Sequence, residues 1–217
     1  MLSHEQEEIL MGKTSFWDRI AGFYDTAQLF NMSVNKQMAA AVESETPKGA
    51  LVLDCAAGTG TLSAAAAKNA RHVRCTDCSG AMLVRSMKKA KKLGIKNISF
   101  AKRDILSLKD TDCTYDAVIA GNVLHLLDDP EKAFSELVRV TKKGGKIIIP
   151  TYLQGEGGLF GILIGVYKLI GFAPRKSFNI DEYLNFIAEN AEANGCAEYS
   201  TRLLYGALPA GFSVITK

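Results

Sequence analysis

From residue 50 onward, short apolar runs alternate with amphipathic stretches, and this alternation constrains the fold more than any other feature of the chain. Consecutive parallel strands need crossover connections that are long enough to hold a helix, so the pattern is typical of βαβ units. It predicts five such strands, at residues 50–54, 73–77, 98–102, 115–120 and 145–152. Two further apolar runs lie close together near the end of the chain, at 197–204 and 211–216, and predict a closing hairpin.

Capping residues indicate where the intervening helices begin. Ser79 is a suitable N-cap for a helix whose apolar face includes Met82. Asp129 with Pro130 opens another helix, because proline is favoured at the first helical position. We expect that helix to end at residues 142–145, where two lysines precede two glycines. A last helix is expected at 181–194, and residues 1–48 are expected to form an N-terminal helical cap.

Composition bounds the organisation of the chain. With 217 residues and 47% hydrophobic content, the chain suits one domain spanning 1–217. The net charge of +3 is far below the basic excess of duplex-binding domains, so we expect no nucleic-acid partner. The polar N-terminus does not resemble a signal peptide, which favours a cytoplasmic location. Cys75 and Cys78 form a CxxC pair without a second pair or a nearby histidine, so no metal site is expected.

A glycine-rich apolar segment at 153–178 interrupts the pattern and is read as a lid insert. It follows the fifth strand, at the edge of the sheet where ligands bind, so residues 155–176 could cover the site with an apolar inner face. Two alternatives remain open at this point. The segment could be a helix buried in the core, or an apolar face flanked by basic residues that makes a peripheral membrane contact.

The first strand runs into a loop of small residues, Ala56-Ala57-Gly58-Thr59-Gly60, that is followed by a helix. Because Gly58 and Gly60 have no Cβ atom, a ligand can approach the backbone closely at these positions. Asp77, at the end of the second strand, can accept hydrogen bonds from both hydroxyls of a ribose. Asp104 follows the third strand, where it could accept from an adenine amino group. Together these residues predict a nucleoside ligand at the carboxyl edge of the sheet.

The fourth strand leads into Gly121-Asn122-Val123-Leu124-His125-Leu126, and with this addition the chain resembles the class I S-adenosylmethionine-dependent methyltransferases. Within them it is most similar to the ubiquinone and menaquinone C-methyltransferases, whose glycine loop also begins Asp-x-Ala, as at Asp54 and Ala56. The segment around Tyr24 looks like that group too, whereas residues 122–126 look like the general small-molecule branch. Five βα units and a hairpin, read with this resemblance, predict a doubly wound, Rossmann-like α/β sheet. Its seven strands would have the order 3-2-1-4-5-7-6, with strand 7 antiparallel.

The resemblance also implies roles for individual residues. S-adenosylmethionine would be the methyl donor, and a small, hydrophobic molecule would be the acceptor. The residues expected to bind the donor are Asp54, Ala56, Gly58 and Gly60 at the methionine and ribose, Asp77 at the ribose, Cys78, Met82, Asp104 and Ile105 at the adenine, and Ala120 and Asn122 at the methionine end. His125 is the candidate general base, since histidine titrates near neutral pH, and Tyr24 is the alternative.

Two other functions fit parts of this pattern. A protein could keep the donor pocket without catalysis and act as a regulatory subunit. A nicotinamide-dependent oxidoreductase could use a similar glycine loop, but it would need more chain for its substrate, and a final antiparallel hairpin is not part of its usual sheet.

Overall fold

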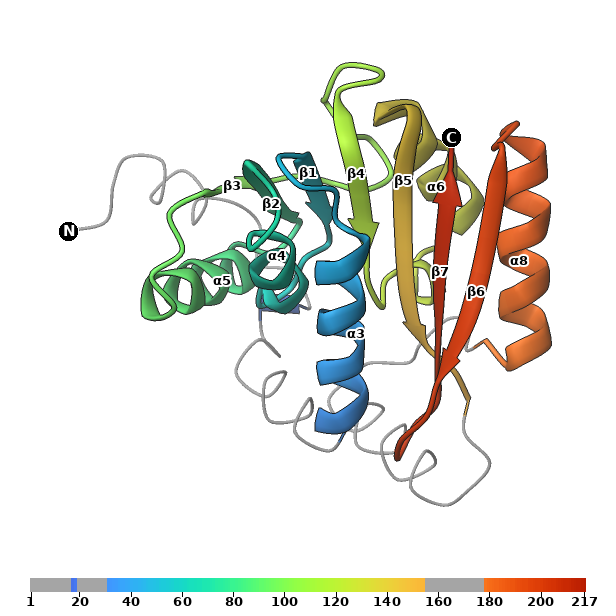
Figure 1. The fold of residues 1–217 in the computed structure, drawn as a ribbon, viewed down its shortest axis with the longest axis horizontal. Coiled ribbons are helices and arrows are strands. Elements are labelled where there is room, and N and C mark those ends of the chain that lie inside the picture. Colours follow the sequence, from blue (N-terminus) through green and yellow to red (C-terminus); the bar gives the residue numbers. More distant parts are fainter. Residues whose placement is uncertain (1–16, 19–30, 155–177) are drawn as a thin grey trace.

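The computed structural model describes residues 17–18, 31–154 and 178–217. A single seven-stranded sheet runs through the molecule (Figure 1). Its strands are β1 (Leu51–Cys55), β2 (His72–Asp77), β3 (Ile98–Lys102), β4 (Tyr115–Ala120), β5 (Thr141–Tyr152), β6 (Glu198–Leu204) and β7 (Ala210–Thr216). They lie in the order β3-β2-β1-β4-β5-β7-β6. The first five are parallel, and β7 is antiparallel to both of its neighbours. The predicted architecture is confirmed.

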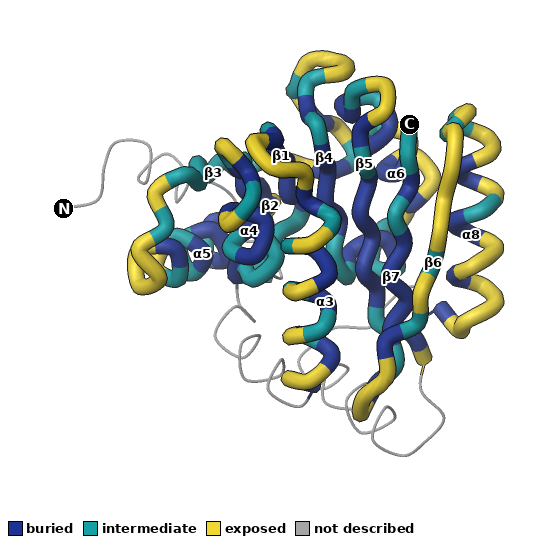
Figure 2. Tube along the Cα trace, viewed as in Figure 1, coloured by how far each residue is buried: buried dark blue, intermediate teal, exposed yellow. Residues whose placement is uncertain are grey.

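Helices cover the two faces of this sheet. On one face lie α3 (Met32–Glu45), α4 (Thr61–Ala66) and α5 (Gly80–Lys92). On the other lie α6 (Pro130–Val140), which packs on β4 and β5, and α8 (Ile180–Ala193), which packs on β6 and β7. Successive residues of the central strands alternate between the two cores: Val52 belongs to the α3–α4 side and Leu53 to the α6–α8 side. The central strands are therefore buried on both faces, whereas β6 forms an exposed edge (Figure 2).

The predicted helix starts are confirmed by their caps. The Ser79 side chain accepts a hydrogen bond from the backbone N–H of Met82 at 3.2 Å, and Asp129 accepts one from Lys132 at 2.9 Å. Pro130 occupies the first turn of α6. In α8, Asn179 and Glu182 cap each other's backbone N–H groups in a capping box.

The end of α6 differs from the prediction. The helix stops at Val140, and Thr141 is already extended, so the two lysines expected in its last turn belong to β5. Gly144 has φ = +74°, and the pairing of β4 with β5 shifts register between Tyr115 and Ala117. The glycines that predicted a helix stop thus lie inside an irregular strand. From Thr141 onward the chain pairs with β4 instead of continuing the helix. This pairing joins segments far apart in sequence, so it cannot be predicted from the residues around the helix end.

Three expectations fall on residues that the structure does not describe: Tyr24, most of the cap at 1–48, and the insert with its cover at 155–176. Within the described ranges, no helix is both long and apolar enough to cross a membrane.

Candidate functional site

The carboxyl ends of β1 and β2 form the centre of the candidate site. β1 lies between β2 and β4, which is where the strand order reverses and where open α/β sheets bind their ligands. The loop after β1 has three residues with positive φ: Ala56 at 49°, Gly58 at 56° and Gly60 at 76°. This left-handed backbone turns the chain sharply into α4, which begins at Thr61.

Gly60 permits the close approach of a helix. A Cβ atom built on Gly60 would lie 1.9 Å from Oγ and 2.9 Å from Cβ of Ser86 in α5. The sequence suggested that a side chain here would occupy ligand volume, but the structure puts α5 against this glycine. Ser86 is buried on the same face of α5 as Met82 and Leu83, so a small polar residue within an apolar helix face was the signal that could have revealed this contact.

Asp77 orders the glycine loop from the neighbouring strand. One carboxylate oxygen accepts the backbone N–H of Gly58 and the other accepts that of Ser79, each at 2.8 Å. Burial raises the pKa of Asp77, and these two hydrogen bonds oppose the rise. A carboxylate oxygen can accept more than one hydrogen bond, so Asp77 can hold the loop and still receive a ligand hydroxyl.

Asp54 is fully buried at the end of β1. Its Oδ2 accepts a hydrogen bond from the Ser63 hydroxyl at 2.5 Å, and among the described residues its Oδ1 has no partner. Burial raises the pKa of Asp54 to about 7, against the effect of the Ser63 hydrogen bond and together with the nearby charge of Asp77. A buried carboxyl group with a free oxygen suits a ligand that brings a cation or a hydrogen-bond donor.

Two contacts that the sequence analysis missed hold the pocket wall. The Lys89 ammonium of α5 donates to the hydroxyls of Thr59 at 3.0 Å and Thr61 at 2.7 Å, across the glycine loop. At the start of α5, the carboxylate of Asp18 accepts from the Ser79 hydroxyl at 2.6 Å and from the backbone N–H of Ala81 at 3.0 Å. Both pairs are far apart in sequence, so no local pattern signals them.

The residues expected at an adenine gather around the ends of β2 and β3. Met82 and Ile105 are buried and apolar, whereas Cys78 and Asp104 are exposed. Asp104 accepts the backbone N–H of Leu106 at 2.9 Å. Desolvation and the carboxylates of Asp77 and Asp104 raise the pKa of Cys78 to about 12, so its thiol is protonated at neutral pH. This arrangement offers an apolar wall with one carboxylate at its rim.

Asn122 joins the ends of β4 and β5. It has φ = +54°, and its side-chain oxygen accepts the backbone N–H of Tyr152 at 2.8 Å. Its side-chain nitrogen lies 3.9 Å from the sulfur of Met38 in α3. The preceding Ala120 is fully buried at the end of β4. Asn122 therefore links the ends of β4 and β5 and contacts a side chain of α3 beside the site.

His125 lies just beyond, in the short 3-10 helix η1 (Leu124–Leu126). Burial lowers the pKa of His125 to about 4, so the imidazole is neutral at pH 7. Its Nδ1 is buried and has no hydrogen-bond partner in the described part of the chain. A neutral ring with a free nitrogen can exchange a hydrogen bond with a ligand, but it is a weak base.

Comparison with known sequences agrees with this geometry. Residues 52–145 match the family described as "Methyltransferase domain". The chain is 30% identical over 190 residues to a demethylmenaquinone methyltransferase of Streptomyces avermitilis, covering 82% of this chain and 78% of that protein. It is 35% identical over 122 residues to a ubiquinone/menaquinone biosynthesis C-methyltransferase of Bdellovibrio bacteriovorus, covering 55% of this chain. The match spans only about half of that relative's length, 52%.

Solved structures share the fold at lower identity. A S-adenosylmethionine-dependent methyltransferase of Thermotoga maritima superposes with a TM-score of 0.70 at 18% identity, over 93% of this chain and 98% of that one. An Aquifex aeolicus structure with the same description gives 0.65 at 20% identity, over 93% and 98%. The seven-stranded sheet with an antiparallel β7 is thus a known architecture.

Proposed function

The chain belongs to the class I S-adenosylmethionine-dependent methyltransferase family, and from this premise we propose that it transfers a methyl group from S-adenosylmethionine to a small, hydrophobic acceptor. When bound, S-adenosylmethionine supplies an electrophilic methyl group on a sulfonium, for in-line displacement by the acceptor. The protein then has to align the two molecules and exclude water.

The observation that carries the proposal is the buried carboxyl of Asp54 near Asp77, with an oxygen that has no partner among the described residues. S-adenosylmethionine brings two positive centres, a sulfonium and an ammonium, and a buried carboxylate favours such a ligand. The pyrophosphate of a nicotinamide dinucleotide would instead place negative charge next to two carboxyl groups. The electrostatics of the site therefore favour the methyl donor over the nicotinamide cofactor.

We assign the donor's parts to the residues that fit them. Asp54 would take the ammonium, and Asp77 with the Gly58 loop would hold the ribose. Met82 and Ile105 would pack on the adenine, with Asp104 at its edge. His125, neutral at pH 7, would accept a hydrogen bond from the methyl acceptor and orient it. Removal of a proton by His125 would require an acceptor that is itself acidic, because an imidazole with a pKa of about 4 is a weak base.

The relatives guide the choice of acceptor. Several of them are named demethylmenaquinone methyltransferases. We propose an aromatic, quinol-like acceptor for this chain. Such a molecule is hydrophobic, and its hydroxyl can donate a hydrogen bond to the neutral imidazole of His125.

The proposal is tested by release of S-adenosylhomocysteine from S-adenosylmethionine in the presence of a short-tailed demethylated quinol, a primary amine or phosphatidylethanolamine vesicles. Of the three acceptors, we expect only the quinol to cause release of S-adenosylhomocysteine. If only the amine or only the vesicles cause release, the acceptor is an amine or a phospholipid and not a quinol. If S-adenosylhomocysteine raises the melting temperature but no acceptor in the panel is methylated, the protein binds the donor without this activity. Stabilisation by NAD alone would overturn the donor assignment.

A further inference from the structure

A second hollow lies on the α6–α8 face of the sheet. It has a volume of about 370 Å³ and is open to solvent. Its lining is polar and is made largely by His72, Arg74, Ser99, Arg103, Lys109 and Asp110. None of these residues has a role predicted from the sequence, and the proposed methyl transfer does not use them.

The hollow lies where none of the described helices covers the sheet. α6 packs on β4 and β5 and α8 on β6 and β7, whereas α5 packs on β2 and β3 from the opposite face. The connection from β3 to β4, residues 103–114, contains no helix, so the described residues place none over β2 and β3 on this face. All five residues of β3 are accordingly only partly buried. Parallel sheets are normally covered on both faces, so an open polar stretch is unusual.

Strand register brings the cationic side chains together on this face. Arg74 pairs with Ser99 of β3, and side chains two residues apart along a strand share a face. Arg103 lies four residues after Ser99 and lines the same hollow, as does Lys109 in the following loop. The hollow therefore receives three cations and one carboxylate, that of Asp110, which leaves an excess of positive charge.

Each arginine of the hollow keeps one donor that the described residues leave unpaired, although Nη1 of Arg103 donates to the backbone oxygen of Lys102 at 2.9 Å. The Nε of Arg74 lies 3.8 Å from Oδ1 of Asp110, beyond hydrogen-bond distance, and that oxygen already accepts the Tyr115 hydroxyl at 2.6 Å. Among the described residues, the buried Nε atoms of both Arg74 and Arg103 have no hydrogen-bond partner. Buried guanidinium donors without acceptors are rare, and they point to a ligand that supplies acceptor oxygens.

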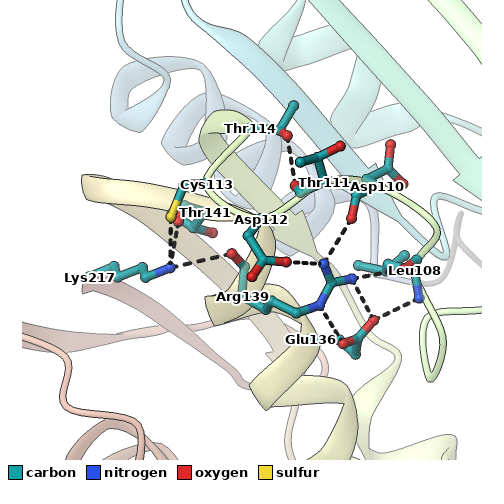
Figure 3. A network of polar contacts seen from close by, with 10 residues as sticks. All are labelled: Leu108, Asp110, Thr111, Asp112, Cys113, Thr114, Glu136, Arg139, Thr141 and Lys217. Atoms are coloured by element: carbon teal, nitrogen blue, oxygen red, sulfur yellow. Dashed lines mark hydrogen bonds and ion pairs between the residues drawn. The ribbon is translucent and has the colours of Figure 1, made fainter.

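Polar contacts from α6 hold the loop at the rim of the hollow (Figure 3). Arg139 of α6 donates to the backbone oxygens of Leu108 at 2.7 Å and Asp110 at 2.8 Å, and it pairs with Glu136 and with Asp112. Glu136 in turn accepts the backbone N–H of Leu108 at 2.8 Å. The loop that carries Lys109 and Asp110 is thus fixed to α6.

We propose that this hollow binds a small molecule through its phosphate group. Arginine guanidinium groups present paired donors that match phosphate oxygens, and the excess positive charge favours a dianion. The volume lies within the range of small-molecule sites, so it can also hold part of the molecule that bears the phosphate. The Ser99 and His72 side chains, 2.8 Å apart, add neutral hydrogen-bonding groups at the wall.

Calorimetric titration with inorganic phosphate and with glycerol 3-phosphate, at constant ionic strength set with sodium chloride, tests the proposal. Both probes should bind the native chain, and the organic phosphate should bind more tightly. The double variant Arg74→Gln/Arg103→Gln should weaken binding at least tenfold. Arg71→Gln, which removes one positive charge outside the lining, should change it less than twofold. Circular dichroism verifies that the variants are folded. If the double variant is unfolded, Lys109→Gln takes its place in the test, because it changes an exposed side chain, and it should weaken phosphate binding severalfold.

Equal binding by the native chain and the double variant would overturn the proposal, as would the absence of binding by both probes at millimolar concentration. If an acidic peptide binds and neither phosphate does, the ligand of the hollow is a protein and the proposal of a small phosphorylated molecule is wrong. S-adenosylhomocysteine affinity should be the same in the native chain and in Lys109→Gln, which separates this site from the donor pocket.

Discussion

Gly60 is the residue whose replacement tests the packing of the candidate site most directly. Gly60→Ala would place a Cβ atom against Ser86 and would also put alanine at φ = +76°. Gly94→Ala is a matched control, because Gly94 has φ = +68° and open space around its Cβ position. We expect Gly94→Ala to cost about 1 kcal/mol of unfolding free energy and Gly60→Ala about 2 to 4 kcal/mol. Urea unfolding measures both, and equal losses would show that the backbone angle alone matters.

At Asp77 the prediction concerns donor affinity. Asp77→Asn keeps one of the two acceptor oxygens and removes the charge, so we expect S-adenosylhomocysteine binding to weaken by about 1 to 3 kcal/mol. Asp116→Asn is the control, since that carboxylate also accepts a backbone N–H, from Leu51, but at the opposite end of the strands. Calorimetry compares the two. Unchanged affinity in Asp77→Asn would show that another residue holds the ribose.

His125 is predicted to act on the acceptor rather than on the donor. We expect His125→Ala to lower kcat by about tenfold to a hundredfold and to change S-adenosylhomocysteine affinity by less than twofold. Because burial lowers the pKa of His125 to about 4, the native rate should not show a histidine titration near pH 6.5. His125→Gln should recover part of the rate through its amide. Loss of donor affinity in step with kcat would instead make His125 a packing residue.

At the scale of elements, α5 forms much of the donor site's wall. It contributes its capped N-terminus, the buried Met82, the Ser86 contact with Gly60 and the Lys89 bridge to the loop hydroxyls. The cap and the apolar face were predictable from the sequence, because both depend on neighbours within one helix. The loop contacts were not, because they depend on how far α5 lies from the end of β1.

Lys89 links α5 to the glycine loop through the hydroxyls of Thr59 and Thr61. Lys89→Gln shortens the side chain and removes its charge, so it should loosen the glycine loop. We expect S-adenosylhomocysteine binding to weaken about threefold to tenfold, which corresponds to about 1 kcal/mol. Lys88→Gln is the control, because Lys88 is the exposed neighbour on the same helix. Thermal unfolding and calorimetry on both variants separate loss of stability from loss of affinity, and matching affinities would contradict the bridge's role.

At the scale of the whole molecule, Asp54 and His125 give stability opposite dependences on pH. Burial raises the pKa of Asp54 from 3.8 to about 7, so between these values the folded state binds more protons than the unfolded state. The contribution of Asp54 to the unfolding free energy therefore falls as pH rises to 7. For His125, whose pKa is lowered from 6.5 to about 4, the unfolded state binds more protons in that window, and its contribution rises with pH.

Single variants separate the two contributions. Between pH 5 and 7.5, Asp54→Asn should gain stability relative to the native chain by on the order of 2 kcal/mol as pH rises. His125→Gln should lose about 1 kcal/mol relative to it over the same range, a value reduced because the imidazole is only partly shielded from solvent. Urea unfolding at a series of pH values and constant ionic strength measures both slopes. If the unfolding free energies of the native chain and Asp54→Asn change with pH in parallel, the pKa of Asp54 is not raised by burial.

The sequence by itself determined the order of strands and helices, the closing hairpin, the helix caps and the acidic residues at the strand ends. Each of these depends on spacing along the chain or on chemistry within a few residues. Only the tertiary structure decided the end of α6, the partner of Gly60, the two hydrogen bonds that Asp77 accepts and the raised pKa of Asp54. It also revealed the basic hollow, because that site arises from strand register on a part of the sheet that no described helix covers. These features depend on distances and burial between segments far apart in sequence, which a local pattern does not contain.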